Sequence, residues 1–271
     1  MISSAVDATT SIVPFAPFTD RPIRLGVLIS GGGTTLLNFV DQIQCGQLLA
    51  EIPLVIASQK NCKGVERARA AGLECLVLRP RDFGSVGDFS EAVFRELRSR
   101  KVDLVTLAGF LSLLQIPNDF LWRVINIHPS LIPAFCGHGF FGHHVHEAAI
   151  QRGVKVSGCT VHFADNEYDH GPIILQKTVT VPDDCTADEL SGLVFELEKL
   201  TYPEAIRLLA SGRLTIRNRR THCPSEAPEN SASGGADCGT FKGNVFPVPS
   251  PPGNGEKVAD RPDEGADLEF I

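Results

Sequence analysis

Short apolar runs alternate with longer amphipathic stretches through the first half of the chain. Residues 23–29 (IRLGVLI) form an uninterrupted apolar run, which is typical of a strand that is buried on both faces. This alternation predicts an α/β fold, with a Rossmann-like, mostly parallel sheet that carries helices on both faces. The other strand-like runs lie at residues 54–57, 75–78, 102–107 and 123–127, and the helical stretches between them lie at residues 34–43, 65–71 and 89–97.

The pattern changes after residue 155. Two strand-like runs, residues 156–164 and 173–181, are joined by the polar segment 165–171. Such a pair predicts an antiparallel return, with a connecting loop that projects from the sheet. The long helical pattern over residues 186–210 contains Pro203, where we expect a kink or a break because proline cannot donate the helical hydrogen bond.

The composition changes again after about residue 216. Residues 221–271 are rich in Pro, Gly, Ser, Asp and Glu, and they hold too few apolar residues to offset the entropy cost of ordering. No internal repeat is evident. The sequence therefore predicts three parts: an N-terminal extension over residues 1–22, one folded domain over residues 23–216, and a disordered tail over residues 217–271.

Composition and charge narrow the class of protein. Of the 271 residues, 43% are hydrophobic and 21% are charged, as in globular proteins, and the net charge of −7 argues against nucleic acid as the main partner. No apolar run approaches the roughly 18 to 20 residues that span a bilayer, and the N-terminus does not resemble a secretory signal. We therefore expect a cytoplasmic protein. Its eight cysteines form no C-x-x-C pair, so we interpret them as reduced thiols and predict no zinc site.

A glycine-rich turn, Gly31 to Gly33, lies between the first predicted strand and the first predicted helix, and it leads into Thr34 and Thr35. Glycine lets the backbone approach an anion closely, and the free N–H groups at a helix start bind phosphate. The motif lacks the G-x-G-x-x-G spacing and the lysine of a P-loop. By itself it is equally consistent with a phosphate site and with a plain tight turn.

Two further groups of polar residues stand where loops leave the predicted sheet. Asn126 and His128 are two residues apart at a strand end, so their side chains point to the same face and could together stabilise an oxyanion. Asp169 lies before the last predicted strand, where its carboxylate could pair with a histidine and raise the pKa of that imidazole. Each group alone also fits a simpler interpretation: a histidine satisfied by loop carbonyls, and an ordinary turn aspartate.

Histidines cluster in the segment that separates these two groups. The neighbours His143 and His144 point apart on a helix, and only Glu147 lies at a matching spacing, so we predict no metal site there. The preceding segment, residues 135–141 (FCGHGFF), is a candidate flap over a cleft. The remaining two histidines of the cluster are His138 and His146.

Taken together, these motifs resemble those of the folate-dependent formyltransferase family, and the similarity covers residues 23–214 in unbroken order. Within the family it is greatest to the members that act on 5'-phosphoribosylglycinamide, abbreviated GAR below. The combination of the two longest motifs at this spacing is much more specific than either motif alone. The motifs are LISGGGTTL (28–36), LAGF (107–110), NIHPSLIP (126–133), GHHVHEA (142–148), VHF (161–163) and DHGPIILQ (169–176).

The resemblance implies an enzyme, a one-carbon group transferase. In this family the formyl group of 10-formyltetrahydrofolate passes to the glycine amine of GAR, a step of de novo purine (IMP) biosynthesis. The resemblance thus implies 10-formyltetrahydrofolate as a co-substrate, no metal, and small-molecule partners rather than nucleic acid or a membrane. We expect a monomer or a homodimer.

The resemblance further implies roles for individual residues. Asn126 and protonated His128 would donate hydrogen bonds to the formyl oxygen, while Asp169 would keep His128 charged and help to move the amine proton to the folate. The residues matched to GAR binding are Gly33, Thr34 and Thr35 for the phosphate and Glu198 for the ribose hydroxyls. Those matched to formyl-folate binding are Leu111, Ser112, Leu113, Leu114 and Asn126, and Thr160 and His162 support the catalytic trio.

Some positions depart from the family's pattern. Serines replace two expected arginines, so we expect the folate tail to be held differently, by Arg79 or Arg81. A histidine, His170, occupies a position that is commonly glycine, where it either fills a turn or perturbs the preceding aspartate. The two serines are Ser90 and Ser112. In addition, Thr35 stands in place of an expected asparagine.

Two other activities are compatible with the motifs. A formyltetrahydrofolate hydrolase shares the catalytic trio, but we expect an N-terminal regulatory domain there, and the glycine-rich loop has a use only in the transferase. A non-catalytic folate-binding module would have no need for all three groups of the trio. A methionyl-tRNA formyltransferase would need a basic tRNA-binding domain in place of the acidic C-terminal region.

Overall fold

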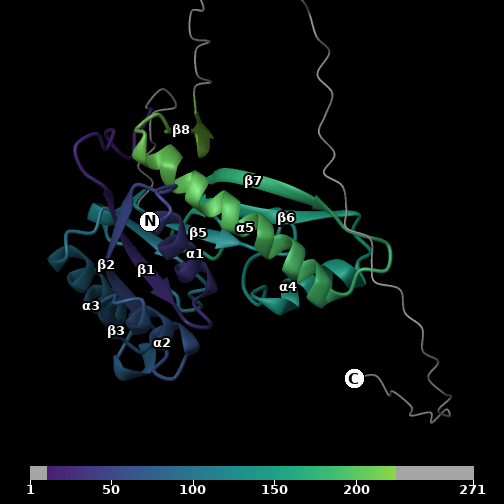
Figure 1. Ribbon diagram of the computed structural model, residues 1–271, viewed down its shortest axis with the longest axis horizontal. Helices are drawn as coiled ribbons and strands as arrows, with labels where there is room; N and C mark the ends of the chain where they lie inside the picture. The colour runs from purple at the N-terminus through teal and green to yellow at the C-terminus, as the bar shows by residue number, and fades with distance from the viewer. Residues whose placement is uncertain (1–10, 224–271) are drawn as a thin grey trace, which may run out of the picture. The chain divides into compact units, whose positions relative to one another are not determined.

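The computed structural model describes residues 11–223, and a mixed seven-stranded sheet forms its centre, with the order β3-β2-β1-β4-β5-β6-β7 (Figure 1). The first five strands are parallel, and β6 and β7 run antiparallel to their neighbours. The expected parallel sheet with an antiparallel return is therefore confirmed. The strands are β1 (Ile23–Ile29), β2 (Ala50–Ala57), β3 (Cys75–Val77), β4 (Leu104–Leu107), β5 (Val124–His128), β6 (Val156–Phe163) and β7 (Ile173–Thr180).

Helices cover both faces of the sheet, because the side chains of its buried strands alternate between two apolar clusters. Along β1, Val27 and Ile29 belong to one cluster and Leu28 belongs to the other. Helices α1, α2, α4 and α5 contribute to the first cluster, and α3 contributes to the second. The helices are α1 (Thr34–Gln44), α2 (Lys63–Ala70), α3 (Val86–Ser99), α4 (His143–Gln151) and α5 (Ala187–Ala210), with short 3-10 turns at Pro80–Asp82 and Asn118–Phe120.

The break that we expected at Pro203 is not present, because α5 continues through this residue as a single helix of 24 residues. Proline cannot donate to the carbonyl four residues before it, which is the carbonyl of Lys199. The Asn38 side chain of α1 supplies the missing donor, with its Nδ2 3.0 Å from the Lys199 oxygen. A tertiary contact thus replaces the lost helical hydrogen bond.

Both ends of the described chain pack against the domain. Ile12 forms an antiparallel bridge with Ile216 in β8 (Thr215–Arg217), and Phe15 is buried. The expected tail begins with structure, since β9 (Arg220–His222) pairs with β8, and the rest of that tail, from residue 224, lies outside the described residues.

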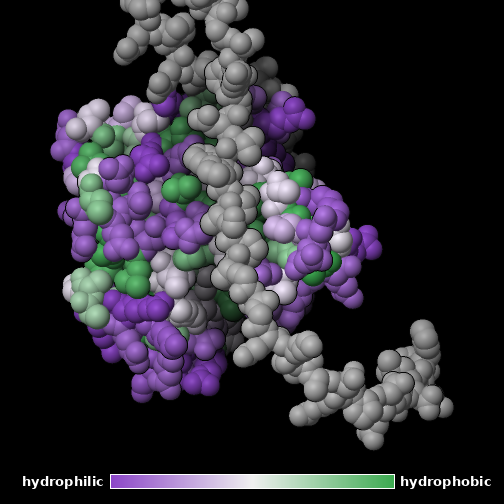
Figure 2. Space-filling model, turned by 45° about the vertical axis from the view of Figure 1, so that its right-hand side comes forward, coloured by the Kyte–Doolittle hydropathy of each residue, from purple (hydrophilic) through white to green (hydrophobic). Residues whose placement is uncertain are grey.

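The surface is largely hydrophilic on the face drawn in Figure 2, where hydrophobic residues form separate small areas. Within residues 11–223, no helix has the length and apolar character needed to cross a membrane. Glycines and the side chains of histidines and acidic residues gather at the carboxyl ends of the parallel strands, which is where open α/β sheets bind ligands.

Candidate active site

A cavity of about 770 Å³ opens at this edge of the sheet. It is lined by the glycine-rich loop after β1, the loop after β4, the end of β5, the β6–β7 loop and one face of α5. Every residue matched to the catalytic trio, to GAR binding or to formyl-folate binding lines this one cavity, whereas the arginines expected at the folate tail do not. The matched residues are Gly33, Thr34, Thr35, Leu111, Ser112, Leu113, Leu114, Asn126, His128, Asp169 and Glu198.

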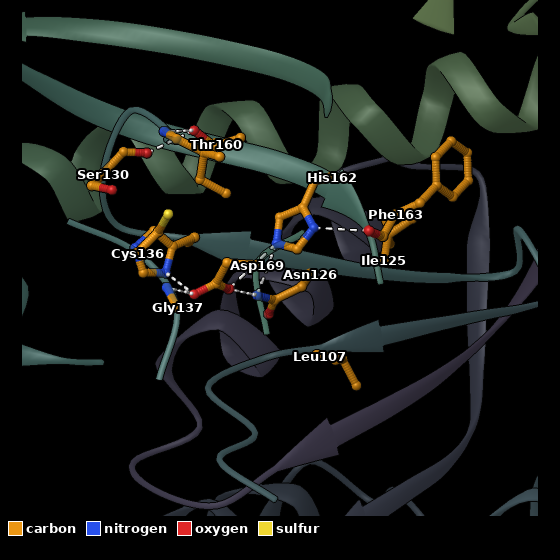
Figure 3. A network of polar contacts seen from close by, with 12 residues as sticks. Leu107, Ile125, Asn126, Ser130, Cys136, Gly137, Thr160, His162, Phe163 and Asp169 are labelled. Atoms are coloured by element: carbon orange, nitrogen blue, oxygen red, sulfur yellow. Dashed lines mark hydrogen bonds and ion pairs between the residues drawn. The ribbon is translucent and has the colours of Figure 1, made fainter. Parts of the chain in front are cut away.

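Strand pairing brings the catalytic candidates together. Asn126 and His128 alternate with Ile127 along β5, and in the register of β5 with β6 Asn126 lies opposite His162. The β6–β7 loop then returns Asp169 to the same place, as Figure 3 shows. Asp169 has a left-handed backbone conformation, with a φ of 53°. This conformation is uncommon for residues other than glycine and requires support from its surroundings.

Asp169 is the centre of a polar network. Its Oδ2 accepts from the Gly137 N–H at 2.9 Å and lies 3.4 Å from Nδ1 of His128, and its Oδ1 lies 3.6 Å from Nε2 of His162. Burial by itself would raise the pKa of this carboxyl, but these partners outweigh burial, and the pKa of Asp169 is lowered. The group is therefore an anion at neutral pH.

The sequence predicted a charged His128 with a raised pKa, and the structure corrects that expectation. Burial is the largest influence and lowers the pKa of His128, against the opposing effects of Asp169 and of the Phe135 carbonyl. The Nε2 atom lies 2.8 Å from that carbonyl oxygen, so it carries a proton, and Nδ1 faces Asp169. The resting ring is neutral, and only a gained proton would let it donate to both neighbours.

The amide of Asn126 is oriented by the same network. His162 is fully buried and its Nδ1 lies 2.8 Å from the Phe163 carbonyl oxygen, which assigns the proton to Nδ1 and leaves Nε2 as an acceptor. The Asn126 Nδ2 then donates to Nε2 of His162 at 3.2 Å and to Oδ1 of Asp169 at 3.3 Å (Figure 3). Both hydrogen bonds are long, so the Asn126 donor can be redirected at little cost.

The glycine-rich loop is held against the start of α2. Gly33, which caps α1, has a φ of 72°, and a Cβ at this position would lie 2.8 Å from the Cα of Gly64. No other residue type fits this close approach without displacing the backbone. The N-terminus of α1 therefore opens into the cavity with its first N–H groups free for an anion.

Glu198 lines the cavity from α5, with Ser191 and Phe195 on the same helix face. Burial raises the pKa of its carboxyl to about 7. Sequence motifs alone identified only Glu198, but the i, i+4, i+7 spacing from Ser191 was a signal for the other two. Of the described residues that line the cavity, none is Lys or Arg.

The residues considered for the folate tail lie outside the cavity lining. Ser90 is buried and does not line the cavity, since its hydroxyl donates to the Val86 carbonyl and accepts from the Gln115 N–H. Neither Arg79, which pairs with Asp82 at 2.6 Å, nor Arg81 lines the cavity. The sequence could not show this, because it does not reveal which way α3 faces a distant loop.

The histidine cluster contributes to the wall of the cavity. Three of its members, His138, His143 and His146, line it, and His144 pairs with Glu147 instead. His146 is buried, burial lowers its pKa to about 4, and its Nδ1 has no hydrogen-bond partner among the described residues. No group of three or more metal-ligating side chains occurs in the described part of the chain.

Comparisons with known proteins agree with this geometry. The model of the family described as "Formyl transferase" matches residues 23–206. The chain is 34% identical over 200 residues to "Phosphoribosylglycinamide formyltransferase, chloroplastic" of Arabidopsis thaliana, covering 73% of this chain and 68% of that protein. It is 37% identical over 196 residues to the "Trifunctional purine biosynthetic protein adenosine-3" of Gallus gallus, covering 72% of this chain but only 19% of that longer protein.

A solved structure shares the fold. The crystal structure of glycinamide ribonucleotide transformylase 1 from Symbiobacterium toebii aligns with a TM-score of 0.71 and 40% sequence identity. The alignment covers 78% of this chain and 98% of the other. The described cavity therefore belongs to a domain whose relatives include proteins of nearly the same extent.

Proposed function

Because this chain belongs to the formyl transferase family, we propose that it transfers the formyl group of 10-formyltetrahydrofolate to the glycine amine of GAR, a step of de novo purine biosynthesis. The observation that carries the proposal is the single cavity of about 770 Å³, which holds a phosphate-type helix start, a carboxylate suited to ribose hydroxyls and the Asn126–His128–Asp169 network. A transferase needs sites for both substrates in one space, and the residues matched to the two substrates line the same cavity, which supports the proposal.

In the proposed reaction the GAR amine attacks the formyl carbon, and a new C–N bond forms as the carbonyl becomes an oxyanion. Asn126 turns its Nδ2 from the two long hydrogen bonds to this oxygen, and removal of such a donor typically costs about 2.7–4 kcal/mol of barrier. The neutral His128 takes the amine proton, and Asp169 stabilises the imidazolium that forms. The bond to the folate nitrogen then breaks, and the proton passes to that nitrogen.

The two substrates occupy different parts of the wall. The GAR phosphate binds the N–H groups at Gly33, Thr34 and Thr35. These backbone groups have to supply the donors, because no Lys or Arg among the described residues lines the cavity. Glu198 accepts from the ribose hydroxyls. Apolar side chains of the loop after β4, together with its backbone groups, receive the flat pterin ring; this segment is Leu111, Ser112, Leu113 and Leu114.

The test follows folate-product absorbance with 10-formyltetrahydrofolate, in the presence and in the absence of GAR. Product that forms only with GAR would support the transferase. Equal turnover without GAR would identify a hydrolase, and no turnover in either case would favour a folate-binding module. We also propose that the chain acts in the cytoplasm, as a monomer or a homodimer.

A further inference from the structure

The loop between β6 and β7 carries the central carboxylate of the site, yet its own backbone is strained. Asp169 has a positive φ, and the following Gly171 is so close to β6 that a Cβ there would lie 1.8 Å from the Phe163 carbonyl oxygen. A residue held in such a conformation persists only when its neighbours over-determine it. Another part of the chain therefore has to hold this loop in place.

The β8–β9 hairpin lies against the loop. Its two-residue turn, Asn218 and Arg219, has φ values of 48° and 60°, as in a type I′ turn. This turn presents the Arg219 guanidinium, whose Nη2 donates to the His170 carbonyl oxygen at 2.7 Å. The same nitrogen lies 3.3 and 3.4 Å from the His170 ring nitrogens and 3.8 Å from the Asp165 carboxylate.

A second contact from the hairpin holds the other side of the turn. The Thr221 hydroxyl of β9 donates to the Ile173 carbonyl at 2.7 Å. Within the loop, the His170 Nδ1 lies 2.9 Å from Asp165 Oδ2, which closes the loop on itself. The hairpin therefore fixes the backbone on both sides of the His170–Gly171–Pro172 turn that follows Asp169.

We propose that Arg219 is a positioning residue for the reaction, which holds the His170 carbonyl and thereby fixes the backbone and carboxylate of Asp169. The inference rests on the proposed function for its kinetic consequence. It concerns the β8–β9 hairpin, which lies beyond residue 206, where the match to the family model ends. His170 acts mainly through its backbone carbonyl, because the shortest contact with Arg219 is to that oxygen.

A structural role and a positioning role differ in what they predict. The Arg219 side chain is 55% exposed, and exposed ion pairs stabilise proteins by only about 0–1 kcal/mol, so its removal should change the melting temperature little. Displacement of a catalytic group by about 1 Å, in contrast, can lower the rate about 100-fold. Loss of rate without loss of stability is therefore the mark of positioning.

The experiment compares Arg219→Ala with Arg220→Ala in the full chain. Both changes remove one positive charge from the same hairpin, but the Arg220 side chain forms no hydrogen bond or ion pair with the described residues. We would measure kcat and the KM for GAR, the melting temperature, and hydrogen exchange of the backbone amides of residues 165–171. His170→Ala, which keeps the carbonyl, and Arg219→Lys, which keeps one donor, complete the set.

We expect Arg219→Ala to lower kcat at least about tenfold with the KM for GAR within about twofold, and to speed exchange in the loop. Arg220→Ala should keep kcat within about threefold, and His170→Ala and Arg219→Lys should fall between. Unchanged kcat and exchange in Arg219→Ala would overturn the proposal. A loss of kcat in Arg219→Ala that comes with an equally marked fall in melting temperature would also overturn it, because that would indicate a structural role.

Failure of the proposed function gives a different result. In that case the parent chain itself would show no GAR-dependent turnover, and the kinetic comparison would have no baseline. Hydrogen exchange would still report whether Arg219 holds the loop. The two proposals can therefore fail separately.

Discussion

At the scale of single residues, Asp169 carries the clearest prediction. Asp169→Asn should lower turnover about 100- to 10,000-fold, because the amide cannot stabilise a positive His128, while it still accepts from the Gly137 N–H and so keeps the loop in place. GAR binding, measured by calorimetry, should stay close to the parent value, since the phosphate site that we propose lies on a different loop.

The matched control is Asp184→Asn, the same substitution at an exposed position outside the cavity lining, which should leave turnover nearly unchanged. A comparable loss of GAR affinity in Asp169→Asn would contradict the assignment of roles. It would mean that the carboxylate holds the substrate rather than the proton-transfer network.

The buried carboxyl of Glu198 makes the stability of the folded protein depend on pH, and the sign of this dependence can be predicted. Its pKa rises from 4.5 to about 7 on folding, so the folded state binds the extra proton and stability falls as the pH rises from about 4.5 to 7. Glu198→Gln removes this cost. The variant should therefore be more stable than the parent at pH 8, by roughly 2 kcal/mol with allowance for partial solvent access, and nearly equal to it at pH 4.5.

Urea unfolding at the two pH values measures this difference, and the KM for GAR measures its functional counterpart. We expect the KM to rise about tenfold in Glu198→Gln, as a charge-assisted hydrogen bond to the ribose is lost. An equal stability difference at pH 4.5 and pH 8 would show that the carboxyl does not titrate in this range.

Residue motifs predicted the members of the site but not their protonation. Asn126 and His128 share a face because strand side chains alternate, and this follows from the sequence alone. The direction of the His128 pKa depends on how deeply the ring is buried and on the Phe135 carbonyl, which a loop brings to it. Such tertiary surroundings leave no mark in the spacing of residues.

At the scale of elements, the glycine-rich turn offers a controlled comparison. Gly33→Ala adds a left-handed strain of about 1–2 kcal/mol and a Cβ 2.8 Å from the Cα of Gly64. Gly46→Ala adds the same strain at φ 70°, with nothing within 4 Å. We expect Gly33→Ala to be the less stable variant in urea, and it alone should weaken GAR binding.

Equal stability and equal GAR affinity in the two glycine variants would contradict this account. The close approach to Gly64 would then not be the reason for glycine at position 33. The affinity for the formyl donor should stay unchanged in both, since the site that we propose for the donor is the loop after β4. That loop is a separate part of the cavity wall.

Element boundaries were predictable where the sequence pattern was local. The strand at residues 23–29 was expected with its observed bounds, because its apolar run is continuous. The break expected at Pro203 failed because Asn38, far away in the sequence, satisfies the Lys199 carbonyl. Local propensity thus gives way where a distant side chain replaces the missing donor.

At the scale of the whole molecule, the segment before β1 is more than an extension. The Ile12 N–H donates to the Ile216 carbonyl at 3.0 Å, and the Ile216 N–H donates back at 2.8 Å. The Phe18 N–H donates to the Ala210 carbonyl, at the end of α5. The start of the described chain therefore holds the region from which the β8–β9 hairpin reaches the Asp169 loop.

Phe15 tests this connection. Its ring is 92% buried, packs 5.8 Å from the Phe18 ring and lies under the Arg123 guanidinium, so Phe15→Ala should destabilise the fold by about 3 kcal/mol. Val13→Ala is the control, because Val13 is 53% exposed and its removal should change the free energy of unfolding by no more than about 0.5 kcal/mol. Urea unfolding measures both. If the two variants unfold alike, residues 11–22 contribute no core, and the sequence-based boundary at residue 23 describes the domain correctly. If Phe15→Ala alone is destabilised, the domain begins before β1, because only a residue inside the cooperative core transmits its loss to the whole fold.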